Sequence, residues 1–139
     1  MSHNTLSFLY ISMVEQYDKQ SLRLLAATMQ VNKVCKACQM LVCDGWESLP
    51  ISFDAQTFKL IGTLKHDEPE PTWDEYHPQG TDIWSNNAPI AVKYHPYNRC
   101  DIHQCKNCTR IYLQYTEYGG YYVDKRIRAL NLDLITDDE

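Results

Sequence analysis

The feature that most constrains the fold of this chain is a pair of CxxC motifs separated by residues 39–104. They are Cys35-Lys36-Ala37-Cys38 and Cys105-Lys106-Asn107-Cys108. Each motif places two thiols on one tight turn, the spacing that tetrahedral zinc needs for two of its four ligands. We therefore predict one Zn²⁺ bound by Cys35, Cys38, Cys105 and Cys108. Its role is expected to be structural, because a closed shell of four cysteines leaves no position for a reactive water.

The choice between metal and disulfides depends on the compartment. The apolar stretch from Leu6 to Val14 is preceded by no Lys or Arg and followed by no small-residue cleavage site, so it does not read as a secretory signal. It is also too short to span a membrane. We expect a cytoplasmic, reducing location with no membrane partner, where paired CxxC motifs usually indicate metal.

Other interpretations of the cysteines remain open at the level of sequence. The four motif cysteines could be reduced, packed thiols that remain from a decayed site. Cys43 and Cys100, which lie near the two motifs, fit three roles: buried apolar residues, substitute ligands, or a disulfide under oxidising conditions. His103 is a weaker ligand candidate. Both motifs resemble the knuckles of a zinc ribbon, but Gln39 and Thr109 stand where the usual pattern has glycine.

The length of 139 residues fits a single domain over 1–139. Apolar residues at helical spacing predict a helical segment over 5–30, as helices at 5–17 and 19–30. The remaining predicted elements are strand–knuckle–strand over 31–44, a strand over 51–64, an irregular acidic segment over 66–92, a second knuckle with its hairpin over 99–123, and a short helix over 125–130 capped by Asp124.

These elements predict an α+β fold. The N-terminal helical segment is expected to pack on an antiparallel sheet that contains both zinc-ribbon-like CxxC knuckles. Gly119-Gly120 is expected to form the turn of a tyrosine-rich hairpin within that sheet.

One enzyme signature is superficially present. Zinc deaminases combine H-x-E with P-C-x-x-C, and His66-Asp67-Glu68 precedes the second CxxC here. The H-x-E of a deaminase must begin a helix, whereas Pro69 and Pro71 prevent a regular turn. Gln104 also replaces the proline before Cys105. We therefore expect a protein that is not an enzyme, with no catalytic residues.

The acidic segment is the best candidate for binding a partner. Residues 66–92 contain no Lys or Arg, and their carboxylates surround aromatic side chains. Acidic groups steer a basic protein, while buried Trp and Tyr commonly supply affinity. The candidate partner-binding residues are Asp67, Glu68, Glu70, Trp73, Asp74, Glu75 and Tyr76. A solvated, proline-rich surface loop is the simpler interpretation of the same residues.

Nucleic acid is the alternative partner. Residues 93–128 interleave basic residues with seven tyrosines, and such a face can stack single-stranded bases. The tyrosines are Tyr94, Tyr97, Tyr112, Tyr115, Tyr118, Tyr121 and Tyr122. The formal net charge of -5 argues against this alternative, because phosphates are repelled by an acidic protein.

Three runs of sequence resemble a known family. They begin at Trp73 (WDEYHP), Tyr97 (YNRCD) and Tyr115 (YTEYGGYYVD). The chain is similar here to a family of small bacterial zinc-ribbon-like proteins, some of which resemble immunity proteins of contact-dependent or related polymorphic toxin systems. The resemblance covers roughly the C-terminal half and supplies no catalytic residues. It implies an immunity protein or antitoxin that neutralises a toxic nuclease or similar effector.

Overall fold

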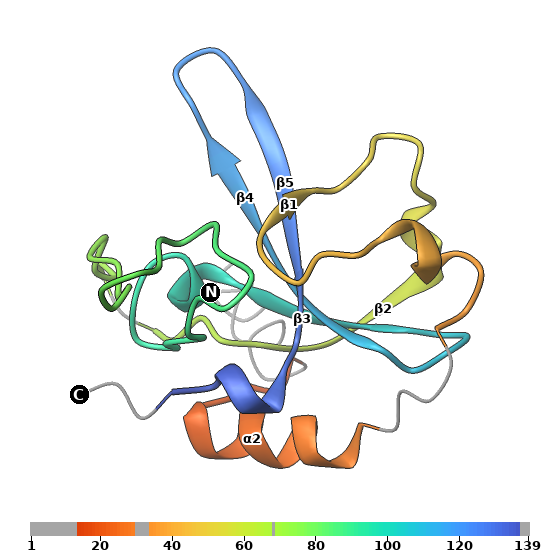
Figure 1. Ribbon diagram of the computed structural model, residues 1–139, viewed down its shortest axis with the longest axis horizontal. Coiled ribbons are helices and arrows are strands. Elements are labelled where there is room, and N and C mark those ends of the chain that lie inside the picture. The colour runs from red at the N-terminus through yellow and green to blue at the C-terminus, as the bar shows by residue number, and fades with distance from the viewer. Residues whose placement is uncertain (1–13, 30–33, 68, 137–139) are drawn as a thin grey trace, which may run out of the picture.

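The computed structural model describes residues 14–29, 34–67 and 69–136. Within them the fold is α+β, with one α-helix and a five-stranded antiparallel sheet (Figure 1). The strands are β1 (Glu47–Ser48), β2 (Phe58–Thr63), β3 (Asp101–Cys105), β4 (Ile111–Tyr118) and β5 (Val123–Ala129). Their order across the sheet is β1-β5-β4-β3-β2.

The helix, α2 (Lys19–Thr28), begins at a reciprocal cap. The Asp18 carboxylate accepts from the Ser21 N–H at 2.8 Å, and the Ser21 hydroxyl accepts from the Asp18 N–H at 2.9 Å. Such a pairing satisfies two backbone donors that a helix start leaves unpaired. The inner face of the helix buries Leu22 and Ala26. The helix expected over 19–30 is thus present as α2.

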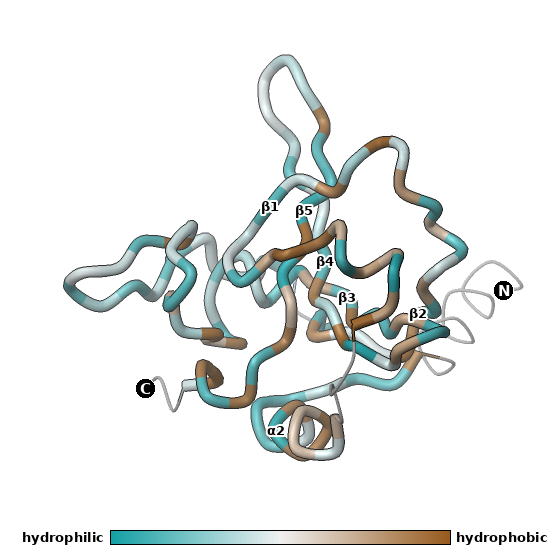
Figure 2. Tube along the Cα trace, turned by 45° about the vertical axis from the view of Figure 1, so that its right-hand side comes forward, coloured by the Kyte–Doolittle hydropathy of each residue, from teal (hydrophilic) through white to brown (hydrophobic). Residues whose placement is uncertain are grey.

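Two buried clusters occupy opposite faces of the sheet. Because side chains alternate along a strand, β4 sends Ile111, Leu113 and Tyr115 to one cluster and Tyr112 to the other. The first cluster also contains Leu22 and Ala26 of α2. The second contains Cys38 and Cys105, one cysteine from each CxxC motif. Figure 2 shows hydrophobic positions gathered around the centre, whereas the tip of the projecting β4–β5 hairpin is pale to teal.

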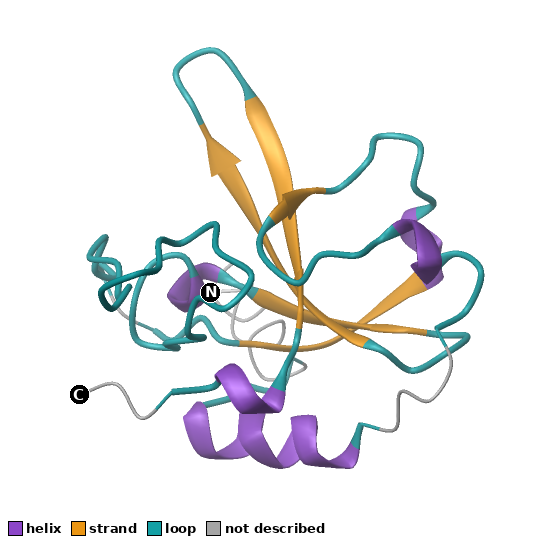
Figure 3. Cartoon of the chain, in the orientation of Figure 1, coloured by secondary structure: helices purple, strands orange, loops and turns teal. Residues whose placement is uncertain are grey.

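In the described residues, the remaining regular structure consists of four short 3₁₀ turns. They are η1 (Cys38–Met40), η2 (Ala55–Thr57), η3 (Tyr97–Arg99) and η4 (Leu132–Leu134). Between β2 and η3 the chain runs as long connecting loops, drawn in teal in Figure 3. Over 66–92 the described residues carry only turns, bends and a single bridge residue, Ile90, which pairs with Ile135.

Arg128 on β5 anchors these loops from within the core. Its side chain is fully buried and donates to the carbonyl oxygens of Asp44, Asn86 and Ala88 at 3.0, 3.2 and 2.7 Å, and to the Tyr97 hydroxyl. A guanidinium has five N–H donors in a rigid fork, so it can satisfy several loop carbonyls at once. No ion pair to Arg128 occurs within the described ranges.

Two sequence predictions around β5 are wrong in detail. Residues 125–130 are not a helix: they lie mostly in β5, where each residue pairs with β4. Asp124 does not cap a helix, since its carboxylate binds Arg126 and the Ser48 hydroxyl. Long-range strand pairing overrides the local preference in this case.

The predicted flanks of the first knuckle and of the first helix also differ. Residues 34–44 contain a turn and η1 but no strand, and the left-handed φ of 32° at Cys43 interrupts the extended run. Residues 14–17 are not helical, because Gln16 forms a parallel bridge with Thr63. The rest of the first predicted helix, and residues 31–33 of the knuckle, lie outside the described residues. The strand expected over 51–64 is shorter, starting at Phe58.

Candidate metal centre

The second CxxC motif forms the turn between β3 and β4. Cys105 is the last residue of β3, and its N–H donates to the Arg110 carbonyl at 2.9 Å while its own carbonyl accepts from the Thr109 N–H at 3.1 Å. The Asn107 N–H donates to the Cys105 sulfur at 3.4 Å. Amide donors directed at sulfur favour the thiolate, which is the form that binds metal.

The first CxxC motif forms a turn that runs into η1. Gln39 and Leu41 donate their N–H groups to the carbonyls of Cys35 and Cys38 at 3.0 and 2.9 Å. These local bonds hold the two thiols on one side of the turn. Residues 39–104 separate the two CxxC motifs in the sequence. The motifs nevertheless lie close together, because cysteines of both belong to the buried cluster that contains Phe58, Tyr112 and Ile127.

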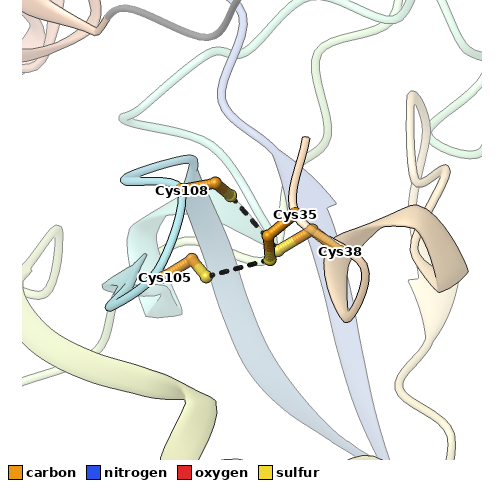
Figure 4. Close-up of side chains that lie close together, drawn as sticks. All are labelled: Cys35, Cys38, Cys105 and Cys108. Carbon is orange, nitrogen blue, oxygen red and sulfur yellow. Dashed lines mark hydrogen bonds between the residues drawn. The ribbon is translucent and has the colours of Figure 1, made fainter. Parts of the chain in front are cut away.

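All four predicted ligands converge. The sulfurs of Cys35, Cys38, Cys105 and Cys108 lie within 4.8 Å of one another, and Figure 4 shows the two turns facing each other. Cys35 and Cys105 sulfurs are 3.7 Å apart, and those of Cys38 and Cys108 are 3.6 Å apart. Tetrahedral coordination at Zn–S distances of about 2.3 Å separates sulfurs by about 3.8 Å. The residues present therefore fit a tetrahedral, thiolate-preferring cation.

The thiols differ in how readily they ionise. Burial raises the pKa of Cys38 and of Cys105. Burial also tends to raise the pKa of Cys108. This effect is outweighed by hydrogen bonds from the backbone of Cys35 and Arg110 and from the side chains of Cys38 and Cys105, which lower the pKa to about 7. Four adjacent thiolates repel one another strongly, so full ionisation of the group requires a bound cation.

A polar network supports the centre from outside. Arg110 donates to the Tyr112 hydroxyl at 2.9 Å, and it also donates to the carbonyls of Leu41 and Val42 at 2.8 and 3.1 Å. The Tyr112 side chain in turn partly offsets the effect of burial on the pKa of Cys38. Outer groups of this kind orient metal ligands. Arg110 and Tyr112 were not singled out from the sequence as supporting groups, although Arg110 stands two residues after Cys108.

The other ligand candidates lie outside this group. Cys43 and Cys100 are buried free thiols, and Cys100 belongs to the cluster on the opposite face of the sheet. Burial raises the pKa of Cys43 to about 12 and that of Cys100 well above its usual value, so both behave as apolar residues. His103 is half-buried on β3 and is not among the converging groups.

The candidate partner-binding residues lie on the long irregular segment. Asp67, Glu70, Trp73, Asp74 and Glu75 are exposed, whereas Tyr76 is half-buried against Tyr94, with ring centroids 5.5 Å apart. Glu68 lies outside the described residues.

Arg99 holds this segment in place, and sequence reasoning did not identify that role. Its guanidinium lies 3.6 Å from the centroid of the Trp73 ring and donates to the carbonyls of Pro71 and Thr72 at 3.0 and 2.9 Å. The His95 N–H donates to the Asp74 carbonyl at 2.8 Å. Trp73 is nevertheless 70% exposed. A large ring is therefore held in a fixed position at the surface.

The tyrosine-rich region does not form one exposed face. Tyr97, Tyr112 and Tyr115 are buried, whereas Tyr118, Tyr121 and Tyr122 are exposed on the projecting hairpin. The arginines of the same region are also engaged: Arg128 lies in the core, and Arg126 pairs with Glu117 and Asp124.

The chain matches no protein-family model, and comparisons with curated proteins and with solved structures likewise find no match. In the part of the chain that the structure describes, no helix has the length and apolar character needed to cross a bilayer.

Proposed function

We propose that this chain is a zinc-stabilised binding protein that neutralises a basic protein partner. In this proposal Cys35, Cys38, Cys105 and Cys108 bind one Zn²⁺ through zinc-ribbon-like knuckles, and the helix packs on the sheet to complete the scaffold. The proximity of the four sulfurs supports the metal assignment. The closed thiolate set supports a structural role, because it leaves no ligand position for catalysis.

The observation that carries the binding role is the presentation of Trp73. Its ring is 70% exposed yet fixed by Arg99 on one face. An exposed aromatic ring that is already ordered loses little conformational entropy on binding, which favours its use as an anchor. Exposed carboxylates of Glu70, Asp74 and Glu75 lie in the same segment. Such groups accelerate association with a basic surface.

The partner that fits this chemistry is a basic toxin, such as a nuclease, whose substrate phosphates are mimicked by carboxylates. The chain then acts as a cytoplasmic immunity protein or antitoxin and is not an enzyme. This proposal agrees with the resemblance of the segments that begin at Trp73, Tyr97 and Tyr115 to a family in which some members resemble immunity proteins. The alternative, nucleic-acid binding through 93–128, is less well supported because Tyr97, Tyr112 and Tyr115 are buried.

The test pairs this chain with the C-terminal domain of a candidate toxin encoded by a neighbouring gene. Trp73→Ala is expected to speed dissociation about thirtyfold, since an anchor contributes about 2 kcal/mol. Lysine substitutions at Glu68, Glu70, Asp74 and Glu75 should mainly slow association and reduce its salt dependence. Both rates can be followed by surface plasmon resonance at two salt concentrations.

Trp84 offers a matched control for Trp73. It is also part-exposed, at 42%, and also lies under a guanidinium, with Arg126 at 4.6 Å from the ring centroid. Trp84→Ala should leave dissociation nearly unchanged. The assignment of this surface to partner binding would be refuted if Trp73→Ala and Trp84→Ala changed the dissociation rate equally, or if the charge reversals left binding unchanged. Salt-sensitive retention of single-stranded RNA without toxin binding would favour the nucleic-acid alternative.

A further inference from the structure

The strand β4 extends beyond the strand that pairs with it on one side. Its last pair with β3 is Gln114 with Asp101, whereas its pairing with β5 continues to Tyr118 with Val123. Before β3 the chain turns away: the Cys100 N–H donates to the Tyr97 carbonyl, and the Cys100 carbonyl accepts from Leu64. Residues 115–118 therefore form an open sheet edge, on the hairpin that projects from the body in Figure 1.

The hydrogen-bond alternation fixes which backbone groups face the open side. Gly119 donates to the Tyr122 carbonyl and Leu130 donates to the Ile111 carbonyl, so odd-numbered residues of β4 face β5. Cys105 donates to the Arg110 carbonyl, so even-numbered residues face β3. The N–H and C=O groups of Thr116 and Tyr118 thus point to the open edge. They have no hydrogen-bond partner on that side within the described ranges.

A groove of about 630 Å³ runs along this edge. Its walls include Trp73, Arg99, Asp101, Tyr115, Tyr118 and Lys125. Tyr115 is only 6% exposed, and its hydroxyl has no hydrogen-bond partner in the described part of the chain. A buried hydroxyl without a partner is costly. Burial also raises the pKa of Tyr115, so the group remains a neutral phenol that can donate to a ligand carbonyl.

These observations identify the kind of ligand. The edge offers donors and acceptors of Thr116 and Tyr118 at the repeat of a strand, about 6.8 Å for every second residue. The groove contains charges of both signs, which suits neither an anion nor a cation alone. The exposed rings of Trp73 and Tyr118 can contact side chains at alternate positions of a bound strand. An extended polypeptide meets all three conditions, because it carries alternating backbone groups and mixed side chains.

We propose that the open edge of β4 at Thr116 and Tyr118 captures an extended segment of a protein partner, which adds a strand to the sheet. The inference rests on the proposed protein-binding function and specifies how the partner is held. Strand addition supplies backbone hydrogen bonds, and Trp73 and Tyr115 supply side-chain contacts beside them.

The probe is a phage-displayed library of random twelve-residue peptides, selected on the full chain loaded with zinc. The best peptide is synthesised and titrated by calorimetry. Amide hydrogen exchange should slow at Thr116 and Tyr118 when it binds. N-methylation of the peptide should abolish binding at alternate backbone positions and have little effect at the positions between them.

Thr116→Pro is the sharpest variant of the protein. It removes an outward N–H that makes no bond to β5, and proline is tolerated at such edge positions. Peptide affinity is expected to fall at least tenfold, whereas the control Thr116→Val keeps the N–H and should stay within about twofold of the unmodified chain. Tyr115→Phe should weaken binding about fivefold, the value of one neutral hydrogen bond of about 1 kcal/mol.

Several results would overturn the inference: a peptide whose binding tolerates Thr116→Pro and every N-methylation, a failure to enrich any peptide, or occupation of the edge by a second copy of this chain. The N-methylated peptides keep the test decisive if Thr116→Pro misfolds. If toxin binding is lost on charge reversal of the acidic segment but survives Thr116→Pro, this inference fails while the proposed function stands. If toxin binding survives the charge reversal but is lost in Thr116→Pro, the β4 edge binds the partner and the acidic segment does not.

Discussion

Thr109 shows how one residue departs from the usual form of a cysteine knuckle. It follows Cys108 and has a φ of 66°, in the left-handed region. Residues with a side chain pay about 1–2 kcal/mol in this conformation, and β-branched residues are the least suited to it. Gln39, which follows Cys38, has no such φ, because it lies within η1. The sequence departs from the glycine pattern at both positions, but only one of them needs glycine.

We expect Thr109→Gly to stabilise the zinc-loaded protein by up to about 1 kcal/mol. Glycine relieves the conformational strain but loses about 0.5–1 kcal/mol through the greater freedom of the unfolded chain. Urea denaturation measures the difference. The matched control is Gln39→Gly, which brings the entropy cost without relief of strain and should destabilise by about 0.5–1 kcal/mol. Equal effects at the two positions would contradict this account.

At the scale of elements, the N-terminal segment and β2 meet at Gly62. A Cβ at Gly62 would lie 2.3 Å from a Tyr17 ring carbon and 2.9 Å from the Glu15 carbonyl oxygen. This close approach allows residues 15–17 to form backbone hydrogen bonds with Thr63. The Tyr17 N–H donates to the Thr63 carbonyl at 2.8 Å, and the Thr63 N–H donates to the Glu15 carbonyl at 2.9 Å.

We expect Gly62→Ala to displace residues 15–17 from the edge of β2. Overpacking of this kind costs about 1–3 kcal/mol, and amide hydrogen exchange at Tyr17 should accelerate because its acceptor moves away. Gly120→Ala is the control, since a Cβ there meets nothing within 4 Å and its φ is not positive. Unchanged exchange at Tyr17 in the Gly62 variant would show that the segment accommodates the methyl group.

Elements were predictable from the sequence where their signals are local. The helical spacing of apolar residues indicated α2, and the CxxC spacing indicated both cysteine turns. The helix expected at 125–130 failed because β5 is determined by pairing with β4, a partner that no local pattern in Lys125–Leu130 reveals. The strand flanks expected for the first knuckle failed similarly: Arg110 takes the carbonyls of Leu41 and Val42 that a neighbouring strand would otherwise bind.

The candidate site divides in the same way. The four cysteines could be named because metal ligands of this type must recur in pairs. Arg99 under Trp73, and Arg128 among the loop carbonyls, could not be assigned, because an arginine in sequence carries no sign of which carbonyls or rings surround it. Their roles depend on contacts between segments that are distant in the chain.

At the scale of the whole molecule, the cysteine centre connects an irregular segment, residues 34–44, to the sheet. Residues 34–44 contribute no strand, and they are attached through Cys35 and Cys38, through the Arg110 bonds, and through the Cys43 carbonyl, which accepts from Ala129 at 2.9 Å. The opposite cluster, with α2, includes none of the four motif cysteines. Loss of metal should therefore affect the two faces of the sheet unequally.

We expect protein purified without added metal to contain about one zinc per chain by elemental analysis, and chelation to loosen residues 34–44 first. A structural zinc contributes on the order of 10 kcal/mol of binding free energy in small peptides, which is lost when the ion leaves. Hydrogen exchange should accelerate at the amides of Gln39 and Leu41, which bond to Cys35 and Cys38, before it does at Leu22 in α2.

Cys35→Ser and Cys105→Ser should both lower zinc content and stability. Cys100→Ala is the matched control, because it removes a buried thiol from the other cluster and should reduce stability while keeping the zinc. A folded, metal-free protein whose 34–44 amides remain protected would refute the structural role, as would a Cys100 variant that loses zinc as completely as Cys35→Ser.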